Sequence, residues 1–333
     1  MKKYKKILII SIVIAILIGL SFVKFPYTIY FPGSVTSLKY KIEVGYTISE
    51  ERGMFLITSV STMPGYFPLV LYALFDPKVG IKSNKVLHPG LTDKDYKALL
   101  SYLMEQSKEV AKVVAMRELG FKVKIKKEGL LIIGVRRDMP CFGVLHVGDI
   151  IVSLDKKTVL KPEDITSILK EKLPNETVPI TVIRKDKKES FNIKVMPKDG
   201  KNTIGIYIIP KYEVSYPFDI NIKIKKYIGN SAGLMFALEI MNQLTESDLT
   251  RGRIISGTGI LDIDGNVHKV GGIIQKVFTA QRAGAYAFLL PYENYKEVKG
   301  RFKGLNLIPV HNIKEAVSKL LTIPMPIYRP KSQ

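Results

Sequence analysis

An uninterrupted apolar run near the N-terminus constrains this chain more than any other feature. Residues 7–23 contain only two serines and one glycine as mild exceptions, and four lysines precede them. Seventeen apolar residues lie at the short end of what spans a bilayer, and the preceding lysines favour a cytoplasmic N-terminus. A cleaved signal peptide is the alternative, but the bulky, charged sequence after Val23 lacks a small-x-small cleavage site. We therefore expect a cytoplasmic tail over 1–6, a single-pass membrane anchor over 7–23, and the rest outside the cell.

The charge balance indicates which partners suit the chain. It holds 51 Lys and Arg against 30 Asp and Glu, a formal net charge of +21. The lysines are scattered rather than clustered with aromatic residues, which argues against nucleic acid. A polyanionic membrane or wall surface is the better neighbour for an exported basic protein. The single cysteine, Cys141, cannot form an internal disulfide, so packing must stabilise the fold.

No cofactor or metal is expected from the motifs. The pair Gly200-Lys201 is followed by Asn202 and lacks the upstream glycine of a phosphate loop. No metal-binding spacing occurs among the four histidines, which are His88, His146, His268 and His311.

Residues 24–120 read as an α/β region outside the membrane. We expect a turn at residues 30–34 and alternating strands at 40–44 and 54–60. A long helix follows, with Thr92 as its N-cap and Gly120 as its stop.

Residues 121–200 change to short strands around a single helix, which indicates a separate module. Three segments of this module resemble a bacterial PDZ domain. They are the glycine-led strand 129–135, the turn and strand Gly148-Asp149-Ile150-Ile151, and the helix starting at Pro162. The resemblance implies a groove between the first strand and the helix, where a peptide adds as an extra strand. The groove residues would be Gly129, Leu130, Leu131, Ile132 and Ile133. The alternative is a small β-rich domain that binds nothing.

A serine between two glycines is the candidate nucleophile. Ser231 lies in Gly229-Asn230-Ser231-Ala232-Gly233 at the start of a predicted helix. The glycines permit a sharp turn and a close approach by substrate, and N–H groups of this turn would stabilise an oxyanion. The alternative is that Ser231 is only an N-cap, a position that serine favours.

Two groups are candidates for the base. Asp264 and His311 follow the serine in the order of an α/β-hydrolase triad, but the strand before the serine is half-exposed and no oxyanion glycine cluster precedes it. Lys276 lies one turn into a helix opened by Gly271-Gly272. The helix dipole and apolar neighbours would there lower the pKa of its amine, which is about 10.4 in water. An exposed helix lysine without a role is the alternative.

Five sequence blocks over residues 203–325 resemble, in order and spacing, the proteolytic domain of the Lon family. They are the serine block, Ser256-Gly257-Thr258-Gly259, Asp264-Gly265-Asn266-Val267, Gly271-Gly272-x-x-x-Lys276 and Ala283-Gly284-Ala285. The resemblance implies that Ser231 is the nucleophile, that Lys276 is the general base, and that the Thr258 hydroxyl helps to hold the lysine. Two departures are Asn230, where the family usually has proline, and Ile228, where many ATP-dependent members have an acid.

With its anchor and PDZ-like module, the whole chain resembles the membrane-anchored, PDZ-containing Lon-like peptidases of Gram-positive bacteria. The segment Met104-Glu105-Gln106-Ser107 in the long helix is also similar to the sequence of that group. We therefore expect an α/β (α+β) fold in which the PDZ-like module precedes the proteolytic domain. The expected function is ATP-independent cleavage of exported peptides or flexible segments, presented by the PDZ-like domain, by a membrane-anchored serine endopeptidase, with the oligomeric state open. A non-catalytic adaptor, or less favourably a hydrolase using Ser231, Asp264 and His311, is the alternative.

Overall fold

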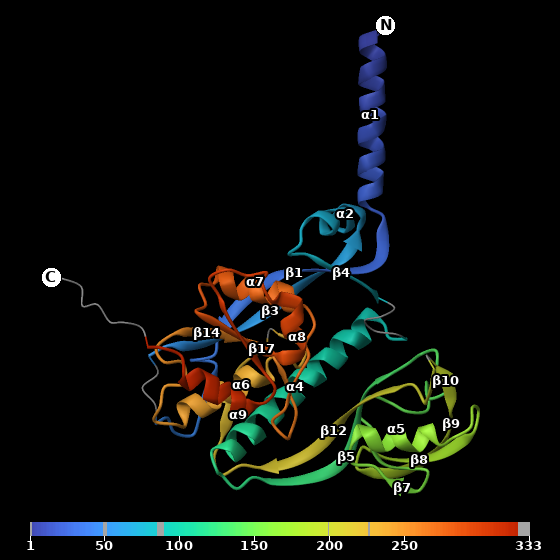
Figure 1. The fold of residues 1–333 in the computed structure, drawn as a ribbon. Helices are drawn as coiled ribbons and strands as arrows, with labels where there is room; N and C mark the ends of the chain where they lie inside the picture. The colour runs from blue at the N-terminus through green and yellow to red at the C-terminus, as the bar shows by residue number, and fades with distance from the viewer. Residues whose placement is uncertain (1, 49–51, 85–89, 199, 226, 326–333) are drawn as a thin grey trace, which may run out of the picture.

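The computed structural model describes residues 2–48, 52–84, 90–198, 200–225 and 227–325. It consists of a long N-terminal helix, a main body and a smaller module (Figure 1). We call residues 124–215 the insert module, and the described parts of 24–123 and 216–325 the main body. Helix α1 (Lys2–Ser21) projects from the main body, and its span Tyr4–Ser21 is long and apolar enough to cross a membrane.

Six strands form the central sheet of the main body, in the order β18-β17-β14-β3-β1-β4. The first four of these run parallel, whereas β1 pairs antiparallel with β3 and β4. The strands are β1 (Lys24–Ser37), β3 (Met54–Tyr66), β4 (Gly80–Ser83), β14 (Ile254–Gly257), β17 (Ala287–Pro291) and β18 (Asn306–Val310). Two short pairs flank this sheet, β2 (Ile42–Val44) with β13 (Ile220–Ile222) and β15 (Ile260–Leu261) with β16 (Val267–His268).

Helices cover both faces of this sheet, because the side chains of the buried strand β17 alternate between two cores. Ala287 and Leu289 pack with α4, α6 and α9, whereas Phe288 and Leu290 pack with α7 and α8. These helices are α4 (Asp93–Glu118), α6 (Gly233–Gln243), α7 (Ile273–Arg282), α8 (Tyr292–Val298) and α9 (Ile313–Leu321). The main body is therefore a three-layer α/β structure, and the predicted fold class is confirmed.

Strand β1 overturns the turn expected at residues 30–34, because these residues continue the strand. Pro32 and Gly33 instead produce an irregularity, since the register with β3 shifts between Pro32 and Val35. A Cβ at Gly33 would lie 2.5 Å from the backbone oxygen of Ser59, so this glycine permits a close strand approach rather than a reversal.

Strand β3 joins the N-terminal region to the C-terminal part of the main body. It pairs in parallel with β14, whose residues lie 200 positions later in the chain. Residues 24–66 and 254–310 therefore share one sheet, although the sequence patterns separate them. Local periodicity carries no signal for a pairing across such a distance.

Helix α4 crosses the main body and leads into the insert module. As predicted, Thr92 caps it, because its Oγ1 accepts a hydrogen bond from the N–H of Asp95 at 3.2 Å, and the helix ends just before Gly120. Its middle packs against α6.

The insert module is an antiparallel sheet in the order β12-β5-β6-β8-β9, with α5 packed on its core. Buried Asp149 accepts two hydrogen bonds from the Arg184 guanidinium, at 2.8 and 2.7 Å. The elements are β5 (Lys124–Val135), β6 (Ile150–Leu154), β7 (Lys157–Thr158), α5 (Pro162–Lys170), β8 (Thr177–Arg184), β9 (Lys187–Lys194), β10 (Met196–Lys198), β11 (Lys201–Thr203) and β12 (Ile206–Ser215).

The pairing of β5 corrects the position expected for a peptide groove. The predicted groove residues, Gly129, Leu130, Leu131, Ile132 and Ile133, lie on β5 as a strand. However, β12 occupies one edge of β5, pairing Pro210 with Leu130 and Ile208 with Ile132, and β6 occupies the other edge. An added peptide strand needs an open edge, so β5 cannot accept it. Among the described strands of the module, β12 forms the outer edge on this side, and α5 lies against it.

Candidate active site

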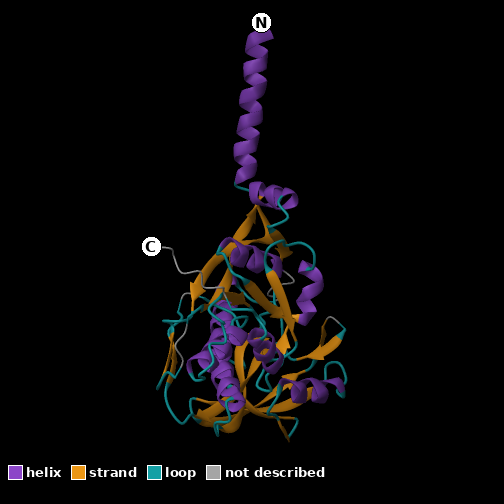
Figure 2. Ribbon diagram, turned by 60° about the vertical axis from the view of Figure 1, so that its left-hand side comes forward, coloured by secondary structure: helices purple, strands orange, loops and turns teal. Residues whose placement is uncertain are grey.

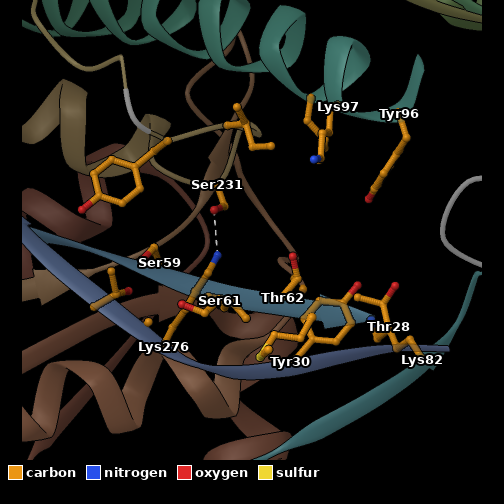
Figure 3. A pocket seen from close by; sticks show the side chains of 18 of the residues that line it. Thr28, Tyr30, Ser59, Ser61, Thr62, Lys82, Tyr96, Lys97, Ser231 and Lys276 are labelled. Atoms are coloured by element: carbon orange, nitrogen blue, oxygen red, sulfur yellow. Dashed lines mark hydrogen bonds between the residues drawn. The ribbon is translucent and has the colours of Figure 1, made fainter. Parts of the chain in front are cut away.

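A cavity of about 920 Å³ lies between α4 and the strands β1 and β3 of the main body. Both Ser231 and Lys276 line it, and Figure 3 shows their side chains pointing toward each other. The structure thus brings together the two residues that the sequence singled out as nucleophile and base.

The turn that carries Ser231 lies between β13 and α6 and is fastened to helix α4. Gly229 has a φ of 91°, a conformation that glycine adopts without steric penalty, and its N–H donates to the backbone oxygen of Leu100 at 2.7 Å. The Ser107 hydroxyl donates to the backbone oxygen of Asn230 at 3.1 Å. Sequence reasoning did not assign a role to Ser107, because the contact joins residues 123 positions apart. Helix α4 therefore holds the serine turn at two points.

Lys276 lies in the first turn of α7, after Gly272 in a left-handed conformation at the N-cap. Its Nζ atom lies 2.7 Å from Ser231 Oγ and 3.1 Å from Thr258 Oγ1. The side chain is buried, and this burial lowers its pKa from 10.5 to about 7. An amine with this pKa is substantially neutral near pH 7, so it has a lone pair to accept a proton.

Thr258 connects the lysine to the serine turn. It follows β14 directly, and its hydroxyl donates to the backbone oxygen of Ser231 at 2.8 Å. The N–H of Gly259 donates to the same oxygen, also at 2.8 Å. Two donors therefore fix the backbone of the serine, while Thr258 Oγ1 is also within hydrogen-bond distance of the lysine amine.

The turn residues differ in what they offer to an oxyanion. The N–H of Gly229 is already bonded to Leu100, and that of Leu234 donates to Gly259 at 3.2 Å. Ala232 is the N-cap of α6 and Gly233 its first residue, where helical geometry leaves N–H groups without an intrahelical acceptor. A Cβ at Gly233 would lie 2.9 Å from Ser107 Oγ, which explains the small residue there.

The alternative base, His311, lies elsewhere. Its Nδ1 is 2.9 Å from Glu315 and its ring stacks on Tyr292. Neither His311 nor Asp264 is among the residues that line the cavity with Ser231. This arrangement overturns the hydrolase triad as an interpretation.

Within the described residues, no group of three or more His, Cys, Asp or Glu side chains could hold a metal ion. His88 lies outside those residues.

One edge of β3 beside Ser231 and Lys276 was missed by sequence reasoning. Strand β14 ends at Gly257, which pairs with Ile57, so β3 extends beyond its partner on this side. The following residues, Thr58 to Thr62, line the cavity with Ser231 and Lys276. The signal in the sequence is the change from Phe55-Leu56-Ile57 to Thr58-Ser59-Val60-Ser61-Thr62, since it marks the point where the strand leaves the core.

Comparison with known families agrees with this division of the chain. The family model for the Lon protease (S16) C-terminal proteolytic domain matches residues 224–323, and the PDZ domain model matches residues 118–195. The chain contains a PDZ domain and a Lon-type proteolytic domain. The PDZ match falls on the insert module but ends before its last strand, β12, and because β1 and β3 belong to the same sheet as β14, the insert module interrupts the main body.

Relatives of the Lon-type domain come from several bacteria. Lon protease 2 of Bacillus subtilis is 28% identical over 110 residues, covering 32% of this chain and 20% of that protein. The Lon protease of Rickettsia bellii is 32% identical over 120 residues, covering 34% of this chain and 15% of that protein. The similarity thus spans at most a fifth of these relatives. The PDZ domain of the SdrC-like protein of Listeria monocytogenes is 30% identical, with 26% of this chain and 93% of that chain covered and a TM-score of 0.25.

Proposed function

We propose that the chain is an ATP-independent, membrane-anchored serine endopeptidase that uses Ser231 and Lys276 as a catalytic dyad. The observation that carries this proposal is the 2.7 Å separation between Lys276 Nζ and Ser231 Oγ in a buried setting that lowers the lysine pKa to about 7. Lon-type domain similarity supports proteolysis as the reaction class.

The reaction proceeds by acyl transfer through the serine. Neutral Lys276 takes the Ser231 hydroxyl proton while Oγ attacks a peptide carbonyl carbon, and backbone N–H groups of Ala232 and Gly233 stabilise the oxyanion. The lysine then gives its proton to the leaving amine as the C–N bond breaks. Water, deprotonated by the same lysine, hydrolyses the acyl-enzyme, which restores the serine. Thr258 positions the amine during both steps.

The open edge of β3 orients the substrate. An extended peptide that pairs with residues 58–62 would lie along the cavity with its carbonyl carbons passing Ser231. Strand pairing recognises the backbone, so substrates need to be unfolded or flexible segments. In the insert module, a peptide would add to the outer edge of β12 beside α5, which replaces the groove first expected on β5.

The direction of the chain in the membrane follows from α1 and the lysines before it. Helix α1 provides the anchor, the residues before it stay in the cytoplasm, and the proteolytic and PDZ domains lie outside. Exported peptides and flexible protein segments are the substrates in reach.

The test uses the full chain in detergent with a panel of unstructured peptides, and mass spectrometry to map the cut sites. Ser231→Ala and Lys276→Ala should each reduce cleavage by at least a thousandfold, whereas Ser101→Ala, an exposed serine on α4, should leave it unchanged. The rate constant kcat/KM should rise with pH through about 7, since only the neutral amine accepts the proton. Wild-type rates in either dyad variant would instead support the non-catalytic adaptor.

A further inference from the structure

The short helix α2 (Phe67–Phe75) is apolar on every side. Its sequence, Phe-Pro-Leu-Val-Leu-Tyr-Ala-Leu-Phe, has no charged residue, and none of its residues is buried. Leu74 and Phe75 are 68% and 79% exposed. A helix of nine residues is too short to be stable in water by itself, and a contiguous apolar surface of this kind marks an interaction site.

Helix α2 is tied to the point where the membrane helix ends. The N–H of Phe67 donates to the backbone oxygen of Val23 at 3.0 Å, and the Phe25 and Phe67 rings lie 6.4 Å apart. At its other turn, Tyr72 stacks on Phe31 of β1, with ring centroids 6.3 Å apart. Figure 2 shows α2 lying at the foot of α1. These contacts with the main body therefore fix the position of α2 along the axis of α1.

The length of the apolar run places that foot at the membrane surface. The helical part of the run, residues 7–21, spans roughly 22 Å at about 1.5 Å per residue, which is less than the hydrocarbon thickness of about 30 Å. The whole run must therefore lie within the bilayer, and Val23 must lie at its boundary. Lys24 is the first charged residue after the run, and Asp76 and Lys78 follow α2; the two lysines suit anionic headgroups.

We propose that α2 lies in the interfacial layer of the bilayer as a second membrane attachment beside α1. A lipid surface is the occupant that fits, because the apolar surface of α2 continues that of α1 and their junction is at the boundary depth. The inference rests on the proposed membrane anchoring and is independent of the proposed catalysis.

Two attachments also fix the direction in which the cavity opens. Lys24 and Pro64 line one end of the cavity, and both lie within three residues of the Val23–Phe67 junction. That end is therefore at the membrane surface. Val60, which lines the cavity near Lys276, is seven residues before Phe67 on an extended strand, so it lies at most roughly 23 Å from that junction.

The chain contains no tryptophan, so a single introduced tryptophan reports on its own surroundings. The experiment places Phe75→Trp in the full chain, reconstituted in phosphatidylglycerol and phosphatidylcholine liposomes with or without brominated acyl chains. Leu74→Trp is a second reporter on α2. The matched control is Leu173→Trp, which replaces a residue of the PDZ domain that is 73% exposed.

Brominated lipid should quench both α2 reporters at least twofold and leave the control unchanged, while aqueous acrylamide should quench the control more strongly. If acrylamide reaches the α2 reporters as readily as the control, the helix lies in water and the inference is wrong. If neither quencher reaches them, protein covers α2, and the inference is wrong as well. A liposome flotation assay distinguishes failure of the α2 contact from failure of the α1 anchor, because a chain that does not float with liposomes also contradicts the anchor. Cleavage of soluble peptides by the same samples tests catalysis separately.

Discussion

Replacing the buried lysine by methionine should change the stability of the protein in a manner that depends on pH. Lys276 is 5% exposed, and its pKa falls from 10.5 to about 7 because burial disfavours the charged form. Between these two pH values the unfolded chain holds a proton that the folded chain has released. Unfolding therefore takes up a proton, and the free energy of unfolding rises with pH across this window.

The size of the effect follows from the two pKa values. The buried amine destabilises the fold by about 5 kcal/mol at pH 6 and by about 1 kcal/mol at pH 10. Lys276→Met removes this term but also removes the hydrogen bonds to Ser231 and Thr258, worth roughly 2 kcal/mol together. The variant should thus be more stable than wild type by about 3 kcal/mol at pH 6 and less stable by about 1 kcal/mol at pH 10.

Urea unfolding of the full chain in detergent, followed by circular dichroism at pH 6 and pH 10, measures both differences. The matched control is Lys314→Met, whose lysine side chain is 78% exposed on α9, and which should shift stability by no more than about 0.5 kcal/mol at either pH. A Lys276→Met difference that keeps the same sign and size at both pH values would refute the reasoning, because the amine would then be charged in the folded protein.

Three further outcomes are expected. Ser107→Ala removes the hydrogen bond from α4 to the nucleophile turn and should lower kcat by roughly tenfold with KM unchanged, whereas Ser101→Ala should change neither in steady-state assays. Asp149→Asn leaves the Arg184 charge without its buried partner and should destabilise the PDZ domain by about 3 kcal/mol in urea unfolding. Cys141 is buried, which raises its thiol pKa to about 11, so iodoacetamide at pH 8 should label it only after unfolding, as mass spectrometry would show.

Features that depend on local contacts could be predicted from the sequence, whereas features that depend on contacts between distant residues could not. The capped start of α4 at Thr92 and the start of α7 after Gly272 rest on neighbouring residues, and both were predictable. Pairing between strands far apart in the chain was not predictable. For that reason we expected a turn within what is strand β1, and we missed β12 on the edge of β5.

Candidate site residues followed the same division. Motif spacing pointed to Ser231, Thr258 and Lys276, whose side chains the fold brings together. It also assigned Gly229 to oxyanion binding, although the N–H of that residue is used by Leu100. The contribution of Ser107 depends on a helix that precedes the serine by more than a hundred residues, so the resemblance of Met104-Glu105-Gln106-Ser107 marked the segment but not its contact with the serine turn.

The geometry of the sheet explains why the dyad and the open strand edge occur at one place. Helix α6, which follows Ser231, packs on one face of the sheet, and α7, which carries Lys276, packs on the other. Side chains from opposite faces can meet only where the sheet is interrupted. Strand β14 ends at Gly257; the N–H of the next residue, Thr258, still donates to Leu289 of β17, while its hydroxyl is within hydrogen-bond distance of the Ser231 backbone oxygen and the Lys276 amine. The same strand end leaves β3 without a partner strand on this edge from Thr58 onward, while its other edge stays paired with β1. A longer β14 would therefore close the substrate edge and separate the lysine from the serine in one step.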